Sequence, residues 1–189
     1  MISFLFKGRR GAFQPIVLGL GVLIFMSLIG YDFPLSFTVS SFFATVFASS
    51  NTIRAFWEDM AINRIILRYG RVGGIFFPYS FVLVVSSLAN FLIMLLSFLI
   101  YNFFGFKEVI GVVVWTLSSS MLTTIVSIIG EMARVNMEFF SMVILIPLLL
   151  GIYGFLSSEN PFVFLGLMVV MGVFYASFAI AFSDIFFEV

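Results

Sequence analysis

The stretch Ile75–Ile100, IFFPYSFVLVVSSLANFLIMLLSFLI, decides the fold class of this chain. It contains no charged side chain, and as a helix rising about 1.5 Å per residue it would exceed the roughly 30 Å hydrocarbon thickness of a bilayer. The whole chain has this character, because 62% of its 189 residues are hydrophobic and only 10% are charged. A soluble domain of this size needs a more polar surface. We therefore expect an all-α integral membrane protein with one transmembrane domain, residues 1–189.

Charged residues and clusters of Pro, Gly and Asn divide the rest of the chain into further apolar runs. Six transmembrane helices are predicted, at approximately 13–29, 33–49, 75–100, 109–129, 139–155 and 162–182. All nine acidic and nine basic residues fall outside these runs, as the cost of a charge inside a bilayer requires. The first two runs are short and joined by a tight turn at 30–34, so a re-entrant pair that does not cross stays open as an alternative.

The basic residues predict the orientation. One side of the predicted membrane carries all but one of them, namely Lys7, Arg9, Arg10, Arg54, Arg64, Arg68, Arg71 and Arg134, and the other side carries Lys107. By the positive-inside rule, the amino terminus and the connections after the second and fourth spans face the cytoplasm or the mitochondrial matrix, and six spans return the carboxyl terminus there. We expect a multi-pass protein of an inner membrane, either the bacterial cytoplasmic membrane or the mitochondrial inner membrane.

The residue types exclude several classes of chemistry. Cysteine and histidine are both absent, which removes disulfides, thiol chemistry and the usual ligands of zinc and haem iron. No Gly-rich phosphate loop, paired carboxylates or nucleophile constellation occurs in any span. The net charge of zero gives no indication of a nucleic-acid partner. We expect no intrinsic catalysis, no metal and no directly bound cofactor, so any energy input has to come from a partner.

The connection between the second and third spans, 50–74, is longer than two adjacent helices need. Two sets of residues in it recur at helical spacing on opposite faces, with Ile62, Ile65, Ile66 and Tyr69 on one and Arg64, Arg68 and Arg71 on the other. An amphipathic helix is predicted, which binds anionic lipid through its arginines, docks on a cytoplasmic protein, or does both. Upstream, Arg54 and Glu58 have the spacing of an ion pair within one helix.

Polar residues elsewhere have two interpretations each. The connection 130–138, with Glu131, Arg134 and Glu138, is either a hydrated charged loop or a second contact for a cytoplasmic partner. Hydroxyl and amide side chains in the third and fourth spans either link helices or line a path. These side chains are Ser86, Ser87, Asn90, Ser118, Ser119, Ser120, Thr123, Thr124 and Ser127.

Two features concern the last spans. Small residues recur every three or four positions in the sixth span, as Gly172, Ala176, Ala179 and Ser183. Such a stripe suits close helix packing, within the chain or across a homodimer seam. Pro147 lies inside the predicted fifth span and is expected to kink it, because a mid-helix proline leaves a backbone carbonyl without its hydrogen bond.

Two stretches carry a resemblance to a known family. The first is Phe56–Ile65, FWEDMAINRI, and the second runs from Ser127-Ile128-Ile129-Gly130 through Met142–Gly151. They resemble the aromatic and acidic segment before the coupling helix, and the Gly-containing fourth-helix end with its Ile-Pro fifth helix, of CcmB, the haem-exporter permease of cytochrome c maturation. The chain departs from the family at Met60, where the family often has glycine, and in a shortened amino-terminal helix at 1–10.

The resemblance implies the membrane subunit of an ABC-type exporter, with a cytoplasmic coupling helix that passes the movement of a separate ATPase into the bundle. Glu58, Asp59, Arg64 and Arg68 would lie at this coupling site. The implied partners are a CcmA-like ATPase, CcmC- and CcmD-like subunits and a second copy of the chain, with haem handled by partners. The alternatives are a permease of another ABC exporter, for lipid, polysaccharide or drug, and a non-transport accessory subunit of a respiratory or other membrane complex.

Overall fold

The computed structural model describes the chain except for residues 1–8, 59, 103–104, 134–140, 142 and 184–189, and it describes 9–12 by their backbone alone. The described residues form helices and no strand, which confirms the all-α prediction. The helices are α2 (Arg9–Ile29), α3 (Phe33–Glu58), α4 (Ala61–Tyr101), α5 (Phe106–Ala133), α7 (Ile146–Ser157) and α8 (Pro161–Ala181).

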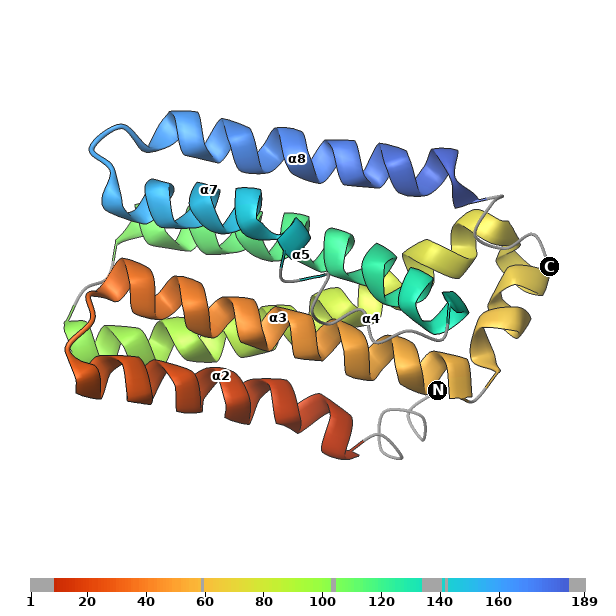
Figure 1. Ribbon diagram of the computed structural model, residues 1–189, viewed down its shortest axis with the longest axis horizontal. Helices are drawn as coiled ribbons and strands as arrows, with labels where there is room; N and C mark the ends of the chain where they lie inside the picture. Colours follow the sequence, from red (N-terminus) through yellow and green to blue (C-terminus); the bar gives the residue numbers. More distant parts are fainter. Residues whose placement is uncertain (1–8, 59, 103–104, 134–140, 142, 184–189) are drawn as a thin grey trace.

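The six helices lie roughly side by side along the long axis of the molecule (Figure 1). Successive helices run in opposite directions, so the short connections α2–α3, α4–α5 and α7–α8 gather at one end of the bundle. The opposite end holds the connection from α3 to α4 and the last turns of α5 and α8. Helix α3 is central, because it packs against α2, α4, α5 and α7, while α8 packs on α5 and α7.

Among the described residues, four helices are long and apolar enough to cross a membrane: α3, α4, α5 and α8. The apolar parts of the other two are shorter, Phe13–Ile29 in α2 and Ile146–Ser157 in α7. The prediction of several long apolar helices is therefore confirmed, while six crossings stay a prediction. Part of the predicted fifth span, at residues 139, 140 and 142, lies outside the described residues.

Helices α3 and α4 extend furthest beyond the predicted spans, at the same end of the bundle. Helix α3 continues past residue 49 to Glu58, and α4 begins at Ala61 rather than Ile75. These extensions carry the charged and polar residues that ended the apolar runs. Hydrophobicity indicates where a helix could enter hydrocarbon, but a helix continues into water as long as its backbone hydrogen bonds do.

The core is built mainly from large apolar side chains of α3, α4, α5 and α7. Trp115 of α5 is the largest fully buried side chain described, and Phe37, Ile93 and Ile152 are buried around the same core. A second, smaller cluster of buried apolar residues lies at the end of the bundle that holds the α3–α4 connection. The two clusters mark the two regions in which the candidate functional residues are found.

Candidate functional site

Residues 61–69 form the first part of α4 and run across the end of the bundle (Figure 1); they are called the lateral helix below. Ile62 and Ile65 are 3% and 8% exposed and pack with Phe56 of α3. Phe77 and Phe81, from the long part of α4, complete this cluster. The lateral helix is thus wedged between the end of α3 and the start of the long part of α4.

The predicted amphipathic pattern is confirmed for residues 62–68, with departures at Tyr69 and at Arg71, which follows the break in α4 at Gly70 and is partly buried. Ile66 is partly buried against the cluster, whereas Arg64 and Arg68 are exposed. Tyr69, predicted for the apolar face, is half exposed and lies flat against Phe77, with ring centroids 6.1 Å apart. The Arg68 guanidinium lies 5.4 Å from the Tyr69 ring centre, so Tyr69 joins the apolar and basic faces.

Both corners of the lateral helix use unusual backbone conformations. Gly70 breaks α4 at φ 74° and ψ 177°, a region that essentially only glycine occupies. Met60 precedes the lateral helix at φ 51° and ψ 23°, the left-handed region, and its N–H donates to the carbonyl of Trp57 at 3.0 Å. The left-handed conformation is less favourable by roughly 1–2 kcal/mol for a residue with a Cβ. This conformation is the one that suits glycine, the residue that the resembled family often has at this position.

The predicted coupling residues occupy one end of the bundle as far as the structure describes them. Glu58 ends α3 and is exposed, Arg64 and Arg68 lie on the outer face of the lateral helix, and Asp59 lies outside the described residues. Arg54 does not pair with Glu58, as its spacing suggested, because its Nε lies 3.6 Å from Oε1 of Glu131. That ion pair joins the end of α3 to the end of α5. Arg134 and Glu138 of the same connection lie outside the described residues.

A series of polar contacts, called the polar seam below, links α3 to α4 and α5 through the bundle. The seam runs along α3 from Ser36, which accepts a 2.8 Å hydrogen bond from the Tyr101 hydroxyl, through Ser41 to Ser49, whose hydroxyl lies 2.9 Å from that of Ser127. It ends at the Arg54–Glu131 pair. From Ser36 to Arg54 the rise along α3 is roughly 27 Å, close to the hydrocarbon thickness of a bilayer.

Asn90 of α4 is the centre of the seam and is fully buried. The indole N–H of Trp115 donates to the Ser41 hydroxyl, which donates to Oδ1 of Asn90 at 2.8 Å. The amide nitrogen of Asn90 donates to the Thr116 hydroxyl at 2.9 Å, and Thr116 donates to the carbonyl of Val112 at 2.7 Å. Ser41, Asn90 and Thr116 therefore each accept one bond and donate another in the same direction, an arrangement in which neighbouring hydrogen bonds strengthen one another.

Three other hydroxyls of α5 are satisfied locally, as a hydroxyl in an apolar helix usually is. Ser119, Thr123 and Thr124 donate to carbonyls one turn earlier in α5. Three buried hydroxyls have no hydrogen-bond partner among the described residues, those of Thr38, Ser86 and Ser120. Ser86 and Ser120 lie one helical turn from Asn90 and Thr116, so the seam has spare hydrogen-bonding groups beside its central layer.

The small-residue stripe of α8 faces α5 over part of its length. A Cβ on Gly172 would collide with the side chain of Ser118, whose hydroxyl donates to the carbonyl of Met168 at 3.0 Å. Ala179 and Ser183 are buried, and Ala176 is partly buried. Of the residues predicted for close packing, Gly172 lies at a close contact between α8 and α5. A homodimer seam stays a prediction.

Pro147 lies in the first turn of α7 in the structure rather than in the middle of a helix. Leu145, just before α7, has helical φ and ψ, and its N–H donates to the carbonyl of Ser141 at 3.0 Å. A proline in a first turn is well tolerated, because the N–H it lacks has no partner within that helix. The kink predicted at Pro147 stays a prediction.

The sequence indicated the polar residues of α4 and α5 but not those of α3. Helix α3 has six buried serine and threonine residues between 36 and 50 besides Thr38, and four of them, Ser36, Ser41, Thr45 and Ser49, supply one side of the seam. The sequence contains a signal for them, since these four, at 36, 41, 45 and 49, recur every four or five residues along an otherwise mostly apolar run. Trp115 also escaped notice, because its N–H becomes a donor to the seam only through its burial.

Comparison of the chain with protein-family models, with curated proteins and with solved structures gives no significant match. The resemblance to the CcmB family consequently rests on the two short stretches at 56–65 and 127–151. The first of them forms the end of α3 and the start of the lateral helix, apart from residue 59, and the second lies partly outside the described residues.

Proposed function

We propose that this chain is the membrane subunit of a two-component transporter of the ABC-exporter type. In this proposal the chain crosses the bilayer six times, a separate cytoplasmic ATPase docks on the lateral helix, and the bundle responds to its movement. The observation that carries the proposal is the position of the lateral helix, a short basic helix across one end of the bundle that packs on two long helices.

The distribution of basic residues supports the choice of this end of the bundle as the docking end. Arg54, Arg64, Arg68 and Arg71 all lie at the end that holds the lateral helix, whereas Lys107 lies at the end with the short turns. The positive-inside rule assigns such an end to the cytoplasm, where ATP is available. Arginines on the outer face of an exposed helix attract an acidic surface of a partner during its approach, and they contact that surface once the partner is bound.

The packing of the lateral helix supports a mechanical role. Its buried isoleucines, Ile62 and Ile65, contact one cluster that includes Phe56 of α3 and Phe77 and Phe81 of α4. Force applied to the lateral helix would reach both long helices, because close-packed side chains transmit displacement rather than absorb it. Gly70 gives this unit a corner at which α4 can change direction.

The polar seam supports a bundle that can rearrange. Its central bonds join neutral groups, Ser41, Asn90, Trp115 and Thr116, so α3 can shift against α4 and α5 without separating charges. The partnerless hydroxyls of Ser86 and Ser120, one turn away, offer new partners after such a shift. A helix-to-helix bond inside a bilayer contributes only about 0.6 kcal/mol on average, which a partner that hydrolyses ATP can overcome.

Haem as cargo, and CcmC- and CcmD-like subunits as further partners, rest on the sequence resemblance alone. The chain has neither histidine nor cysteine, so haem ligation of the usual kind would fall to a partner. Recovery of such partners with the chain would extend the proposal to cytochrome c maturation. An ATPase without them would favour an exporter of another cargo.

Purification of the tagged chain in mild detergent, with mass spectrometry and an ATP hydrolysis assay, tests the proposal. We expect an ATPase to copurify with the wild-type chain and to be lost from an Arg64→Glu/Arg68→Glu variant. Glu159→Arg, a charge reversal at the exposed turn of the opposite end, is the matched control and should retain the ATPase. Recovery of a respiratory assembly without any ATPase, in wild type and variant alike, would instead establish the accessory-subunit alternative.

A further inference from the structure

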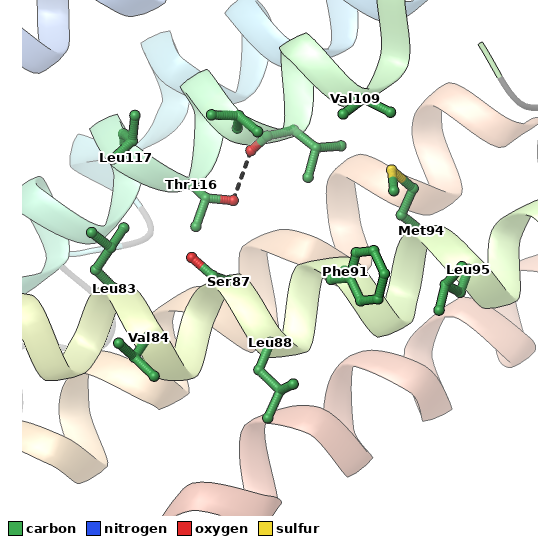
Figure 2. Close-up of a pocket in the computed structure, with 12 residues that line it drawn as sticks. Leu83, Val84, Ser87, Leu88, Phe91, Met94, Leu95, Val109, Thr116 and Leu117 are labelled. Atoms are coloured by element: carbon green, nitrogen blue, oxygen red, sulfur yellow. Dashed lines mark hydrogen bonds between the residues drawn. The ribbon is translucent and has the colours of Figure 1, made fainter. Parts of the chain in front are cut away.

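A long groove lies between α4 and α5, with a volume of about 1010 Å³ (Figure 2). Its walls come from residues 83–95 of α4 and 109–117 of α5. Val84, Leu88 and Val113 are at least half exposed along its rim, whereas Met94, Val112 and Thr116 are buried. The groove is therefore open on one side and has a closed floor.

The lining of the groove restricts what it can bind. Its side chains are apolar apart from the hydroxyls of Ser87 and Thr116, and none of them is charged. Ligand sites are usually lined by apolar residues with a few polar groups, and their volumes lie between about 300 and 1000 Å³. Because no cation or anion lines the groove, a charged group inside it would have no partner at membrane depth. The groove suits a large, uncharged, mostly apolar molecule.

Ser87 supplies the only unused polar group among the lining residues. Figure 2 shows its hydroxyl directed from α4 towards α5, and it makes no hydrogen bond within the described chain. Two other hydroxyls of α4, those of Ser80 and Ser97, donate to carbonyls of their own helix, whereas the adjacent hydroxyl of Ser86 is buried and also has no partner among the described residues. Thr116 is already bonded to Asn90 and Val112. A hydroxyl that faces hydrocarbon without a partner is costly, so Ser87 calls for a hydrogen-bonding ligand.

The depth of Ser87 in the proposed membrane indicates which class of lipid can bond to it. Ser87 lies roughly 18 Å along α4 from Ile75, near the middle of the apolar stretch 75–100. In the proposed membrane placement this is close to the bilayer midplane. A phospholipid places its ester and headgroup oxygens at the interface and presents only its tails at this depth. A neutral lipid that resides within the hydrocarbon can bring a carbonyl or hydroxyl to Ser87.

We propose that the groove between α4 and α5 binds a neutral lipid whose hydrogen-bonding group meets the Ser87 hydroxyl near the bilayer midplane. Thr116 connects the floor of the groove to Asn90, so an occupant would touch the polar seam through one side chain. The interpretation of this lipid as cargo rests on the proposed function. Its binding requires only that the helices cross the membrane.

An isoprenoid quinone that carries a photoreactive diazirine is a suitable probe, because it is neutral, apolar and bears carbonyl oxygens. The purified full chain, without any ATPase, is reconstituted in phosphatidylcholine vesicles and irradiated, and labelled peptides are identified by mass spectrometry. We expect saturable labelling of 83–95 and 109–117. Ser87→Ala should weaken probe binding about fivefold, which corresponds to the loss of about 1 kcal/mol for one hydrogen bond.

Val113→Trp, which fills the groove from its exposed rim, should abolish the saturable labelling. Val170→Trp, the same change on the exposed face of α8, is the matched control and should leave it intact. Equal labelling of α8 and the groove, or of the Val113→Trp variant and the wild type, would overturn the proposal, since bulk lipid contact explains both. Because the chain has no cysteine, a Leu88→Cys variant adds one thiol. Efficient disulfide dimers through that thiol would show that a second copy covers the groove, and would also overturn it.

A failure of this proposal is distinct from a failure of the transporter proposal. Labelling is measured on the chain alone and copurification on its partner. An ATPase that copurifies with a chain whose groove is not labelled would remove only the lipid site. Labelling without an ATPase partner would remove only the interpretation of the lipid as cargo.

Discussion

In the polar seam, side chains of α3, α4 and α5 bond to one another at the centre of the bundle, and each central partner is satisfied. The lateral helix is held differently, by the apolar side chains of Phe56, Ile62 and Ile65 and by unusual backbone at both of its corners. The first arrangement links three long helices across the core, and the second leaves a small unit attached at two corners. Substitutions in the seam should therefore weaken the whole bundle, whereas substitutions at the lateral helix should act locally.

The largest effect is expected from Asn90→Ala. The change leaves Ser41 and Thr116 without their bond to α4 and opens a space in the core, with an expected loss of about 2–3 kcal/mol of unfolding free energy. Ser97→Ala is the matched control on the same helix, because Ser97 is equally buried but donates only to the carbonyl of Ile93. Chemical unfolding in mixed micelles measures both. Equal losses for the two variants would show that the bonds of the seam are not what stabilises the bundle.

Gly70→Ala should give the next largest effect. A Cβ at φ 74° and ψ 177° is strained by roughly 1–3 kcal/mol, so the corner between the lateral helix and the long part of α4 has to rearrange. Hydrogen exchange of the amides of 61–69 should rise while that of 75–100 stays unchanged. Gly166→Ala lies in α8 with open space around its Cβ, and should be neutral or stabilising by about 0.5–1 kcal/mol. Faster exchange throughout the bundle in Gly70→Ala would contradict the local attachment of the lateral helix.

Met60→Gly should stabilise the other corner by up to about 1 kcal/mol. Glycine removes the strain of the left-handed conformation at residue 60, φ 51°. Part of this gain is lost, because glycine has more backbone freedom in the unfolded chain than methionine. Asn102→Gly, at φ 50° after α4, is the control with a smaller expected gain, because asparagine tolerates this conformation. Thermal unfolding of the two variants compares the gains. A loss of stability in Met60→Gly would indicate that the Met60 side chain contributes more than its backbone costs.

The smallest effect is expected for Arg54→Ala. The Arg54–Glu131 pair closes the seam at an exposed position, and such pairs contribute about 0–1 kcal/mol. The difference between variant and wild type should shrink further as salt is added, since exposed charges are screened. Unfolding at low and high ionic strength measures this. A large loss that salt does not reduce would place the pair among the main contacts of the seam.

The all-helical fold followed from the sequence, because long apolar runs between charges admit few other structures. The amphipathic lateral helix followed as well, through the spacing of Ile62 and Ile65 against Arg64 and Arg68. Its corners could not be predicted in the same way, since φ and ψ at Met60 and Gly70 depend on how α3 and α4 meet. The pairing of Arg54 with Glu131 also escaped sequence reasoning, because it joins helices that come together only in the folded bundle.

The polar seam could be predicted from the sequence only in part. Its residues in α4 and α5 stand out in the sequence as hydroxyls and Asn90 in apolar runs, whereas their partners in α3 do not follow from hydrophobicity. A count of apolar residues gives no weight to serine and threonine that recur along one helical face. The same search applied to α3 would have indicated Ser41, Thr45 and Ser49 as a polar face towards its neighbours.

Photocrosslinking from the lateral helix tests the central claim most directly. Leu67 is 87% exposed on its outer face, and because the chain has no cysteine, Leu67→Cys adds a single attachment point for a photoreactive group. Phe106→Cys, at the opposite end and 80% exposed, is the matched control. In native membranes we expect crosslinks from position 67 to a nucleotide-hydrolysing protein and none from position 106. Crosslinks from position 67 to lipid alone would contradict a docking role for the lateral helix.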